Sequence, residues 1–130
     1  MSEYKLTING AFYGNHCFPG FNDYRQRQTT SPYVGARLLR DAETICINNI
    51  RKQFIGVKFT SPVIVHFYFY EPDRRRDLDN ILGFAEKAVL DSMQQAGVLP
   101  NDNQHYIRKL SAEIINDKNP RIEVVFEEEQ

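Results

Sequence analysis

Two aspartates one residue apart, Asp77 and Asp79, are the clearest candidates for chemistry in this sequence. They lie in the charged segment EPDRRRDLDN (71–80), which directly follows the apolar run PVIVHFYFY. Two carboxylates this close repel each other, and a divalent cation relieves the repulsion because Mg²⁺ and Mn²⁺ prefer hard oxygen ligands. The pair therefore predicts a metal site, and Asp102 in the later segment LPNDNQ is the candidate for a third ligand.

A helix predicted to follow the pair adds a second pattern. Asp79, Gly83, Lys87 and Asp91 are spaced by four, so they lie along one side of that helix. The same residues also allow a structural interpretation. Asp77 and Asp79 can complement the helix dipole, and Lys87 with Asp91 can form an ordinary i,i+4 ion pair. The spacing alone leaves both interpretations open.

Four segments carry the pattern of β-strands. Residues 4–8 alternate apolar and polar side chains, as expected when one face of a strand is buried. Residues 62–70 are apolar on both faces, which is typical of a central strand. Two further strands are predicted at 106–115 and 121–126, separated by the turn sequence NDKNP.

Two segments carry the spacing of helices. The first runs from the Ser-Pro pair at 31–32, which suits a helix start, to about Ile55. The second runs from about Leu78 to Ala96, with a stripe of small and apolar residues. Residues 14–31 are rich in Gly, Pro, Asn and Thr, and predict a long loop of the kind that often carries function.

The order of these elements, β-α-β-α-β-β, predicts an α/β fold of the mixed α+β kind, with one mixed β-sheet packed with two main helices. Asp77 and Asp79 then lie where the central strand ends and a helix begins. Open α/β sheets commonly bind ligands at such an edge. An antiparallel return of the chain after that helix would bring Asp102 beside the pair.

Composition is that of a compact globular protein. The 130 residues, 42% of them hydrophobic, fit a single domain over 1–130, with an acidic tail from about residue 127 expected to fray. The sequence carries neither an export signal nor a long apolar run, so we expect a cytoplasmic protein with no membrane partner. Cys17 and Cys46 have no CxxC spacing and predict neither a disulfide nor a zinc site.

The segment DRRRDLDN, followed by KAVLDSMQQAGVLPNDNQ, resembles the core motif of the RusA-type Holliday-junction resolvases, or crossover junction endodeoxyribonucleases. In that family a DxDN pair, a helical lysine, a glycine and a later aspartate occur in this order. Upstream, FPGFNDY resembles the family's Pro-x-x-Asn loop, with Pro19 and Asn22 in the matching places. The resemblance implies a mixed α/β fold and a homodimer that cuts four-way DNA junctions with a divalent metal.

Carried over residue by residue, the resemblance implies that Asp77, Asp79 and Asp102 bind Mg²⁺, or Mn²⁺ as a substitute, and act in catalysis. Lys87 is implied as a further catalytic residue, which contacts the scissile phosphate or orients water. The family lysine, however, stands one helical turn nearer the DxDN motif than Lys87 does. Three residues are implied in support of the site: Asn22, Asn80 and Asp91.

The distribution of charge favours contact with DNA phosphates at one part of the surface. The net charge of −1 argues against a generally basic coat, but residues 1–60 hold eight Lys and Arg against four acids. Arginines that share one face can follow the phosphates of branched DNA without reading bases. The predicted DNA contacts are Arg25, Arg27, Arg37, Arg40, Arg74, Arg75 and Arg76.

The predicted activity is metal-dependent hydrolysis of paired phosphodiester bonds at a Holliday junction, in DNA recombination and repair. The main alternative is a non-catalytic protein of the same fold that binds branched DNA. A sugar-nucleotide transferase with a DxD motif fits less well, because 130 residues leave little room for two substrate domains. An EF-hand calcium loop fits poorly, since Ile81 and Leu82 occupy places that need an oxygen donor and a glycine.

Overall fold

The computed structural model describes residues 2–9 and 18–129. Cys17, for which the sequence predicts no disulfide or zinc role, lies outside the described residues, as does the start of the predicted loop 14–31. No helix within the described ranges is long and apolar enough to cross a membrane.

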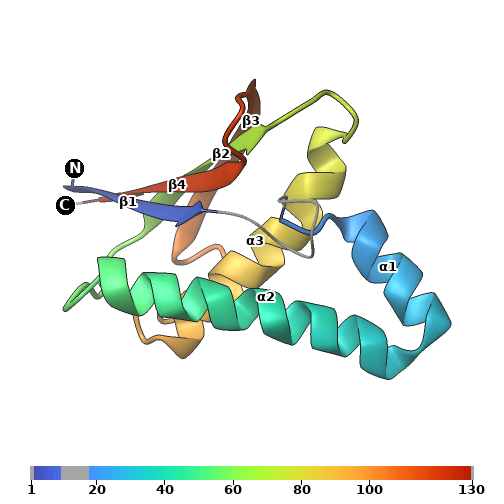
Figure 1. The fold of residues 1–130 in the computed structure, drawn as a ribbon. Coiled ribbons are helices and arrows are strands. Elements are labelled where there is room, and N and C mark those ends of the chain that lie inside the picture. The colour runs from blue at the N-terminus through green and yellow to red at the C-terminus, as the bar shows by residue number, and fades with distance from the viewer. Residues whose placement is uncertain (1, 10–17, 130) are drawn as a thin grey trace.

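Within residues 2–9 and 18–129, four strands form one mixed sheet (Figure 1). They are β1 (Ser2–Asn9), β2 (Val63–Glu71), β3 (Ile107–Asn116) and β4 (Arg121–Glu128), in the order β1-β4-β2-β3. β4 is antiparallel to β1 and to β2, whereas β2 and β3 are parallel. The predicted mixed sheet and the inner position of β2 are therefore confirmed. Although β3 and β4 are consecutive in the chain, β2 lies between them, so the turn that joins them closes no hairpin.

In the described part of the chain three helices accompany the sheet, namely α1 (Phe21–Thr30), α2 (Pro32–Gln53) and α3 (Leu78–Gln95). α2 and α3 are the two main helices predicted, and both lie on the same side of the sheet (Figure 1). Ser31 caps α2 as expected, because its Oγ accepts a hydrogen bond from the N–H of Tyr33 at 3.3 Å. Pro32 follows in the first turn, where its missing N–H costs nothing.

α1 corrects the prediction of a loop over residues 14–31. None of its residues is buried, so its sequence FNDYRQRQTT has no apolar stripe that could have revealed a helix. Local hydrogen bonds stabilise it instead. A carboxylate oxygen of Asp23 accepts the N–H of Gly20 at 2.8 Å, and the hydroxyls of Thr29 and Thr30 donate to carbonyls one turn earlier.

The strict alternation of β2 sorts its side chains onto two faces. The inward series, which is completely buried against the helices, consists of Val63, Val65, Phe67 and Phe69. Glu71 continues this series and is only 6% exposed. A carboxylate so little exposed requires a partner, because an unpaired buried charge is strongly destabilising.

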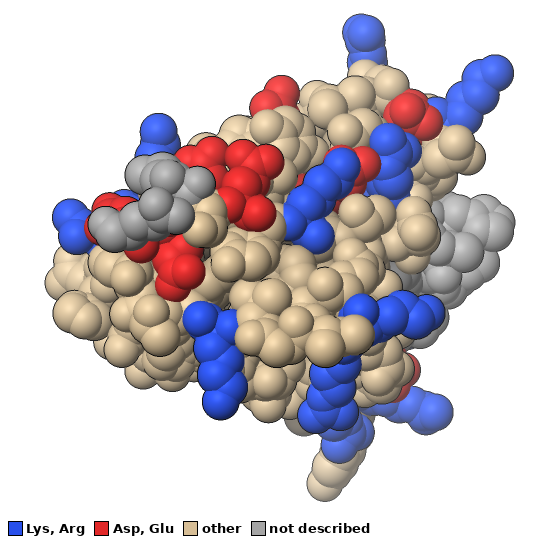
Figure 2. All heavy atoms as spheres, turned by 90° about the vertical axis from the view of Figure 1, so that its left-hand side faces the viewer, with Lys and Arg blue, Asp and Glu red and all other residues tan. Residues whose placement is uncertain are grey.

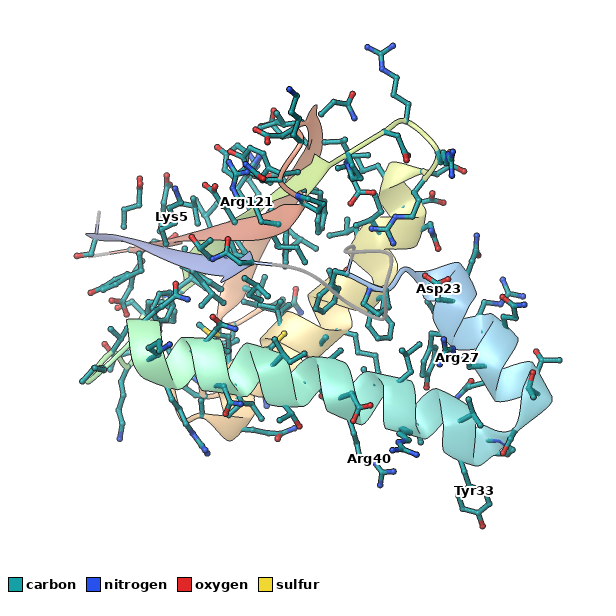
Figure 3. The ribbon with its side chains drawn as sticks, in the orientation of Figure 1. Lys5, Asp23, Arg27, Tyr33, Arg40 and Arg121 are labelled. Carbon is teal, nitrogen blue, oxygen red and sulfur yellow. The ribbon has the colours of Figure 1, made fainter. Side chains whose placement is uncertain are left out.

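On the face of the sheet away from the helices, side chains form ion pairs. Glu123 of β4 accepts from Lys5 at 2.6 Å and from Arg121 at 2.8 Å, and the Arg121 guanidinium lies 3.6 Å from the centre of the Tyr70 ring. Figure 3 shows both cations on the side of the sheet away from α2. Burial raises the pKa of Glu123, but the hydrogen bonds from the two cations outweigh it and hold that pKa below its usual value.

The acidic end of the chain is more ordered than the expected frayed tail from residue 127. β4 extends to Glu128, whose Oε2 accepts the N–H groups of Thr60 and Ser61 at 2.8 and 3.2 Å. The N–H of Glu129 then donates to the carbonyl of Pro62 at 3.0 Å. These bonds attach the end of β4 to the segment that leads into β2.

Candidate active site

The turn between β2 and α3 is fixed by a buried ion pair. The Nε and Nη2 atoms of Arg76 each donate to one oxygen of Glu71, both at 2.9 Å, and Nη1 donates to the carbonyl of Phe18 at 2.6 Å. The Arg76 side chain is 20% exposed. This bidentate geometry suits a guanidinium and explains how β2 can end in a buried acid.

Arg76 therefore has a different place from the one predicted for it. As the third residue of the RRR run it was expected to contact DNA, but its guanidinium points inward to Glu71 and Phe18. Its side chain connects the end of β2 to the segment before α1. Its structural role is thus to hold the Pro-x-x-Asn segment next to the start of α3.

Asn80 makes a second connection between the same two segments. Its Oδ1 accepts the backbone N–H of Asn22 at 2.6 Å. Gly20 lies so close that a Cβ on it would stand 2.6 Å from Nδ2 of Asn80, which leaves no room for a side chain there. The two motifs that carry the sequence resemblance, residues 19–22 and 77–80, are therefore side by side. The contribution of Asn22 to this contact comes from its backbone.

Asp77 and Asp79 lie at the start of α3 with their side chains exposed. Asp77 occupies the N-cap position, but its side chain makes no capping hydrogen bond. Asp79 accepts only the neighbouring N–H of Asn80, at 2.9 Å, among the hydrogen bonds of the described residues. Both carboxylates thus keep oxygen lone pairs directed to solvent. Hard oxygen donors of this kind fit Mg²⁺, which is commonly held by one or two carboxylates together with water and phosphate oxygens.

Asp102 does not lie beside that pair in the way the sequence analysis expected. It precedes β3, and because β3 is parallel to β2, it lies toward the end of the sheet where β2 begins. The expected antiparallel return does not occur. Within residues 2–9 and 18–129 there is no group of three or more His, Cys, Asp or Glu side chains arranged to hold a metal ion.

Asp102 acts electrostatically on an acid of α3, Glu86, which was not among the residues predicted for the site. Burial raises the pKa of the Glu86 carboxyl, and the negative charge of Asp102 raises it further. Glu86 follows Asp79 by seven residues, which is two helical turns on the same face. That spacing was the available signal. The acids therefore lie at two levels of α3, with Asp77 and Asp79 at its start and Glu86 with Asp102 further along.

Lys87 and Asp91 face α2. The Nζ of Lys87 lies 3.6 Å from Oδ2 of Asp91, as in the structural alternative left open by the spacing. Both residues also act on Glu43 of α2. Burial raises the pKa of that carboxyl, Asp91 raises it further, and Lys87 opposes the change. This places the two side chains at the α2–α3 contact, around the helix from Asp79, because residues four apart drift by about 40° per step.

The family model described as Endodeoxyribonuclease RusA matches residues 22–127. The chain belongs to the RusA endodeoxyribonuclease family. No curated protein matches it. The match begins at Asn22, the second residue of α1, and includes α3 and the acids of the candidate site. The family is one of endodeoxyribonucleases, and hence of hydrolases, of the class that resolves Holliday junctions.

For a RusA protein the exposed arginines bear on DNA contact. Arg75 is 88% exposed, and Arg74 donates from Nε to Asn116 at a long 3.4 Å. The remaining predicted contacts, which lie on α1 and α2 with exposed side chains, are Arg25, Arg27, Arg37 and Arg40. Figure 3 shows Arg40 extending from α2 away from the sheet, and Asp23 and Arg27 on α1. Six of the seven predicted arginines thus have exposed side chains.

The end of this RusA protein where the chain termini meet is unsuited to phosphate. Figure 2 shows acidic side chains gathered there. Glu3 and Glu127 are cross-strand partners of β1 and β4, and Glu128 is opposite Ser2. Like charges in this arrangement repel an anionic backbone. Contacts with DNA are therefore more favourable around the α1–α2 hairpin and the turn before α3.

Proposed function

We propose that this protein resolves branched DNA by Mg²⁺-dependent hydrolysis of phosphodiester bonds, with Asp77 and Asp79 as the principal metal ligands. The observation that carries the proposal is the exposed carboxylate pair at the start of α3, held in place by the Arg76–Glu71 and Asn80–Asn22 contacts. The bound ion would lower the pKa of the attacking water and neutralise charge on the phosphate.

Other residues of the chain would supply further metal ligands and contacts to the DNA phosphates. Asp102, before β3, and Glu86 of α3, whose pKa the charge of Asp102 raises, would supply further oxygen donors. Arg74 and Arg75 lie in the turn that precedes Asp77, where they can bind the phosphates on either side of the scissile one. Mn²⁺ would substitute for Mg²⁺, because both prefer carboxylate and water ligands. Lys87 would act only if the substrate drew it away from Asp91.

The protein would work as a homodimer of single-domain chains. A four-way junction is nearly two-fold symmetric, and two identical active sites related by a two-fold axis would cut two of its strands in matching positions. Paired cuts of this kind leave two duplexes, which is the outcome that recombination and repair require. The proposal therefore specifies both the chemistry and the symmetry of the enzyme.

The test offers a synthetic four-way junction and Mg²⁺ to the wild-type protein and to Asp79→Asn. We expect paired nicks from the wild type, and junction binding without nicks from Asp79→Asn. Asp41→Asn, which removes an exposed carboxylate from α2, is the matched control and should cut like the wild type. Cutting by Asp79→Asn at the wild-type rate would contradict the assignment of the site.

A second candidate function is non-catalytic binding of branched DNA. It is favoured by one observation, namely that no group of three potential metal ligands is assembled among the described residues. The same experiment separates the two functions. Tight junction binding with no nicks from wild type, Asp79→Asn or Asp41→Asn, at any Mg²⁺ or Mn²⁺ concentration, would support the binding protein and reject the nuclease.

A further inference from the structure

The two edges of the sheet differ in how their backbone groups are used. β1 forms one edge and β3 the other. At the β1 edge, the side-chain amide of Gln53 forms two hydrogen bonds with Thr7: Oε1 accepts its N–H at 2.8 Å, and Nε2 donates to its carbonyl at 2.7 Å. This amide imitates a neighbouring strand and blocks the middle of the β1 edge.

β3 has no such cover from any residue that the structure describes. Among the described residues, no hydrogen bond from a side chain or another segment reaches the backbone of residues 108–115 on the side away from β2. The strand is ten residues long. Its side chains toward the helices, Leu110, Ala112 and Ile114, are only partly buried. A long edge with unpaired backbone groups and half-covered apolar side chains is a template for another strand.

The charges on β3 are complementary to themselves in one antiparallel register. Two copies related by a two-fold axis at Ser111 would place Lys109 of each opposite Glu113 of the other, which makes two ion pairs. On the helix side, Leu110 would lie opposite Ala112. Moving the axis to Leu110 or to Ala112 would instead set Lys109 opposite Ser111 or Ile115. Only the register centred on Ser111 pairs opposite charges.

We propose that two copies of this chain pair along their β3 edges, antiparallel and centred on Ser111. The inference gives the homodimer of the proposed function a specific surface, and so rests on that proposal. An axis perpendicular to the sheet keeps the helices of both copies on one side. Both Asp77–Asp79 pairs would then face the same side of one continuous sheet, where a single junction can reach them.

Neighbouring groups on the same face allow this pairing. His66 of β2 contacts both Ser111, through Nδ1, and Glu113, through Nε2 at 3.0 Å. The second oxygen of Glu113 is left for Lys109 of the other copy, since the Glu113 side chain is 53% exposed. His66 therefore orients Glu113 without occupying the whole carboxylate.

The first experiment reverses one charge at a time. Lys109→Glu and Glu113→Lys each set like charges opposite each other twice, so each variant should dimerise at least about tenfold more weakly in sedimentation equilibrium. Mixing the two variants restores both ion pairs in a heterodimer, as does the double variant Lys109→Glu/Glu113→Lys with itself. Recovery of dimer in the mixture also shows that both variants are folded.

The second experiment fixes the register. Ser111→Cys, in a Cys17→Ser background, should form a disulfide between copies on mild oxidation, because residue 111 lies opposite itself. Cys46 does not compete, since it is buried and burial raises the pKa of its thiol to about 12. Lys118→Cys, in the turn after β3, is the control and should form no such link.

The outcomes separate this surface from the homodimer itself. A wild-type protein that remains monomeric would overturn both, and Lys109 would then be a charge that protects the edge from pairing. A wild-type dimer that persists unchanged in Lys109→Glu and Glu113→Lys, or that fails to link through residue 111, would overturn the β3 surface alone. Junction nicking by the wild type tests the proposed chemistry independently of both.

Discussion

The charges in the turn between β2 and α3 fall into two groups that differ in burial. Glu71 and Arg76 are enclosed, and two N–H groups on one edge of the guanidinium, Nε and Nη2, donate to the Glu71 carboxylate. Asp77 and Asp79, the two acids that follow Arg76, are exposed and form no ion pair within the described residues. The first pair determines where the backbone goes, and the second presents oxygen atoms to whatever approaches. Structure and chemistry are thus assigned to adjacent residues.

This difference shows why a run of charge is ambiguous. In the RRR segment, Arg74 and Arg75 extend into solvent while Arg76 closes the turn from inside. The three are the same residue type, so composition treats them alike. Their contributions to stability differ, because breaking a buried ion pair is strongly destabilising whereas an exposed arginine contributes little to folding. Mutation should separate them clearly.

The largest effect is expected from removing Arg76. Arg76→Ala leaves Glu71 buried without its cation, and this should lower the free energy of unfolding by about 3–5 kcal/mol. Arg75→Ala, its neighbour with an exposed side chain, should change it by less than about 0.5 kcal/mol. Urea unfolding of both variants provides the measurement. Equal losses in the two would show that the buried pair is not what fixes the turn.

The second largest effect is expected from Mg²⁺ binding by the exposed pair, Asp77 and Asp79. If the exposed acids bind Mg²⁺, the ion should stabilise the wild type by about 2.7 kcal/mol at one hundred times its Kd, and EDTA should reverse this. Asp77→Asn/Asp79→Asn should abolish the gain while leaving the unfolding free energy without metal almost unchanged. Asp41→Asn should keep it. A full Mg²⁺ gain in the double variant would place the ion elsewhere.

Much of the fold was predictable because its elements have a clear period. The alternation of β2 and the apolar stripes of α2 and α3 indicate which side of each element faces the core. The same parity could have identified Glu71, which continues the inward series of β2 by two residues. The sequence of α1 has no such apolar stripe, because none of its residues is buried. Its position depends on hydrogen bonds and on the packing of one partly buried residue, Tyr24, against Phe84, and neither produces a periodic pattern.

The candidate site was predictable only where its residues are close in sequence. Asp77, Asp79 and Asn80 share one turn, so their proximity follows from the chain itself. The position of Asp102 depends on whether β3 runs parallel or antiparallel to β2, and the connection through α3 and its loop allows either direction. Lys87 depends on the rotation of α3, which its packing against α2 decides. Long-range placement of this kind is set by tertiary packing.

A smaller effect should come from the glycine beside Asn80. Gly20→Ala would bring a Cβ within 2.6 Å of Nδ2 of Asn80, so the amide must shift and weaken its bond to Asn22. We expect a loss of about 1–3 kcal/mol in stability, together with slower nicking. Gly83→Ala is the matched control. Its Cβ would meet Phe21 at an ordinary 3.6 Å, and helix propensity should raise stability by up to about 1 kcal/mol.

The smallest effect concerns Glu43, which is intermediate between the two groups of charge. It is half-buried at the α2–α3 contact, and its pKa is raised by burial and by Asp91, while the nearby cation, Lys87, lies 3.6 Å from Asp91 instead. A carboxyl whose pKa is raised on folding stabilises the protein below its unfolded pKa and loses that contribution as the pH rises through the folded value.

Glu43→Gln should therefore be slightly more stable than the wild type at pH 7. The difference should vanish below the ordinary value of 4.5, where the wild-type carboxyl is also neutral. Thermal unfolding from pH 3.5 to 7.5 would reveal it. A variant less stable than the wild type at pH 7 would mean that the Glu43 charge stabilises the folded protein. Glu43 would then resemble the paired Glu71 more than the solvated Asp79.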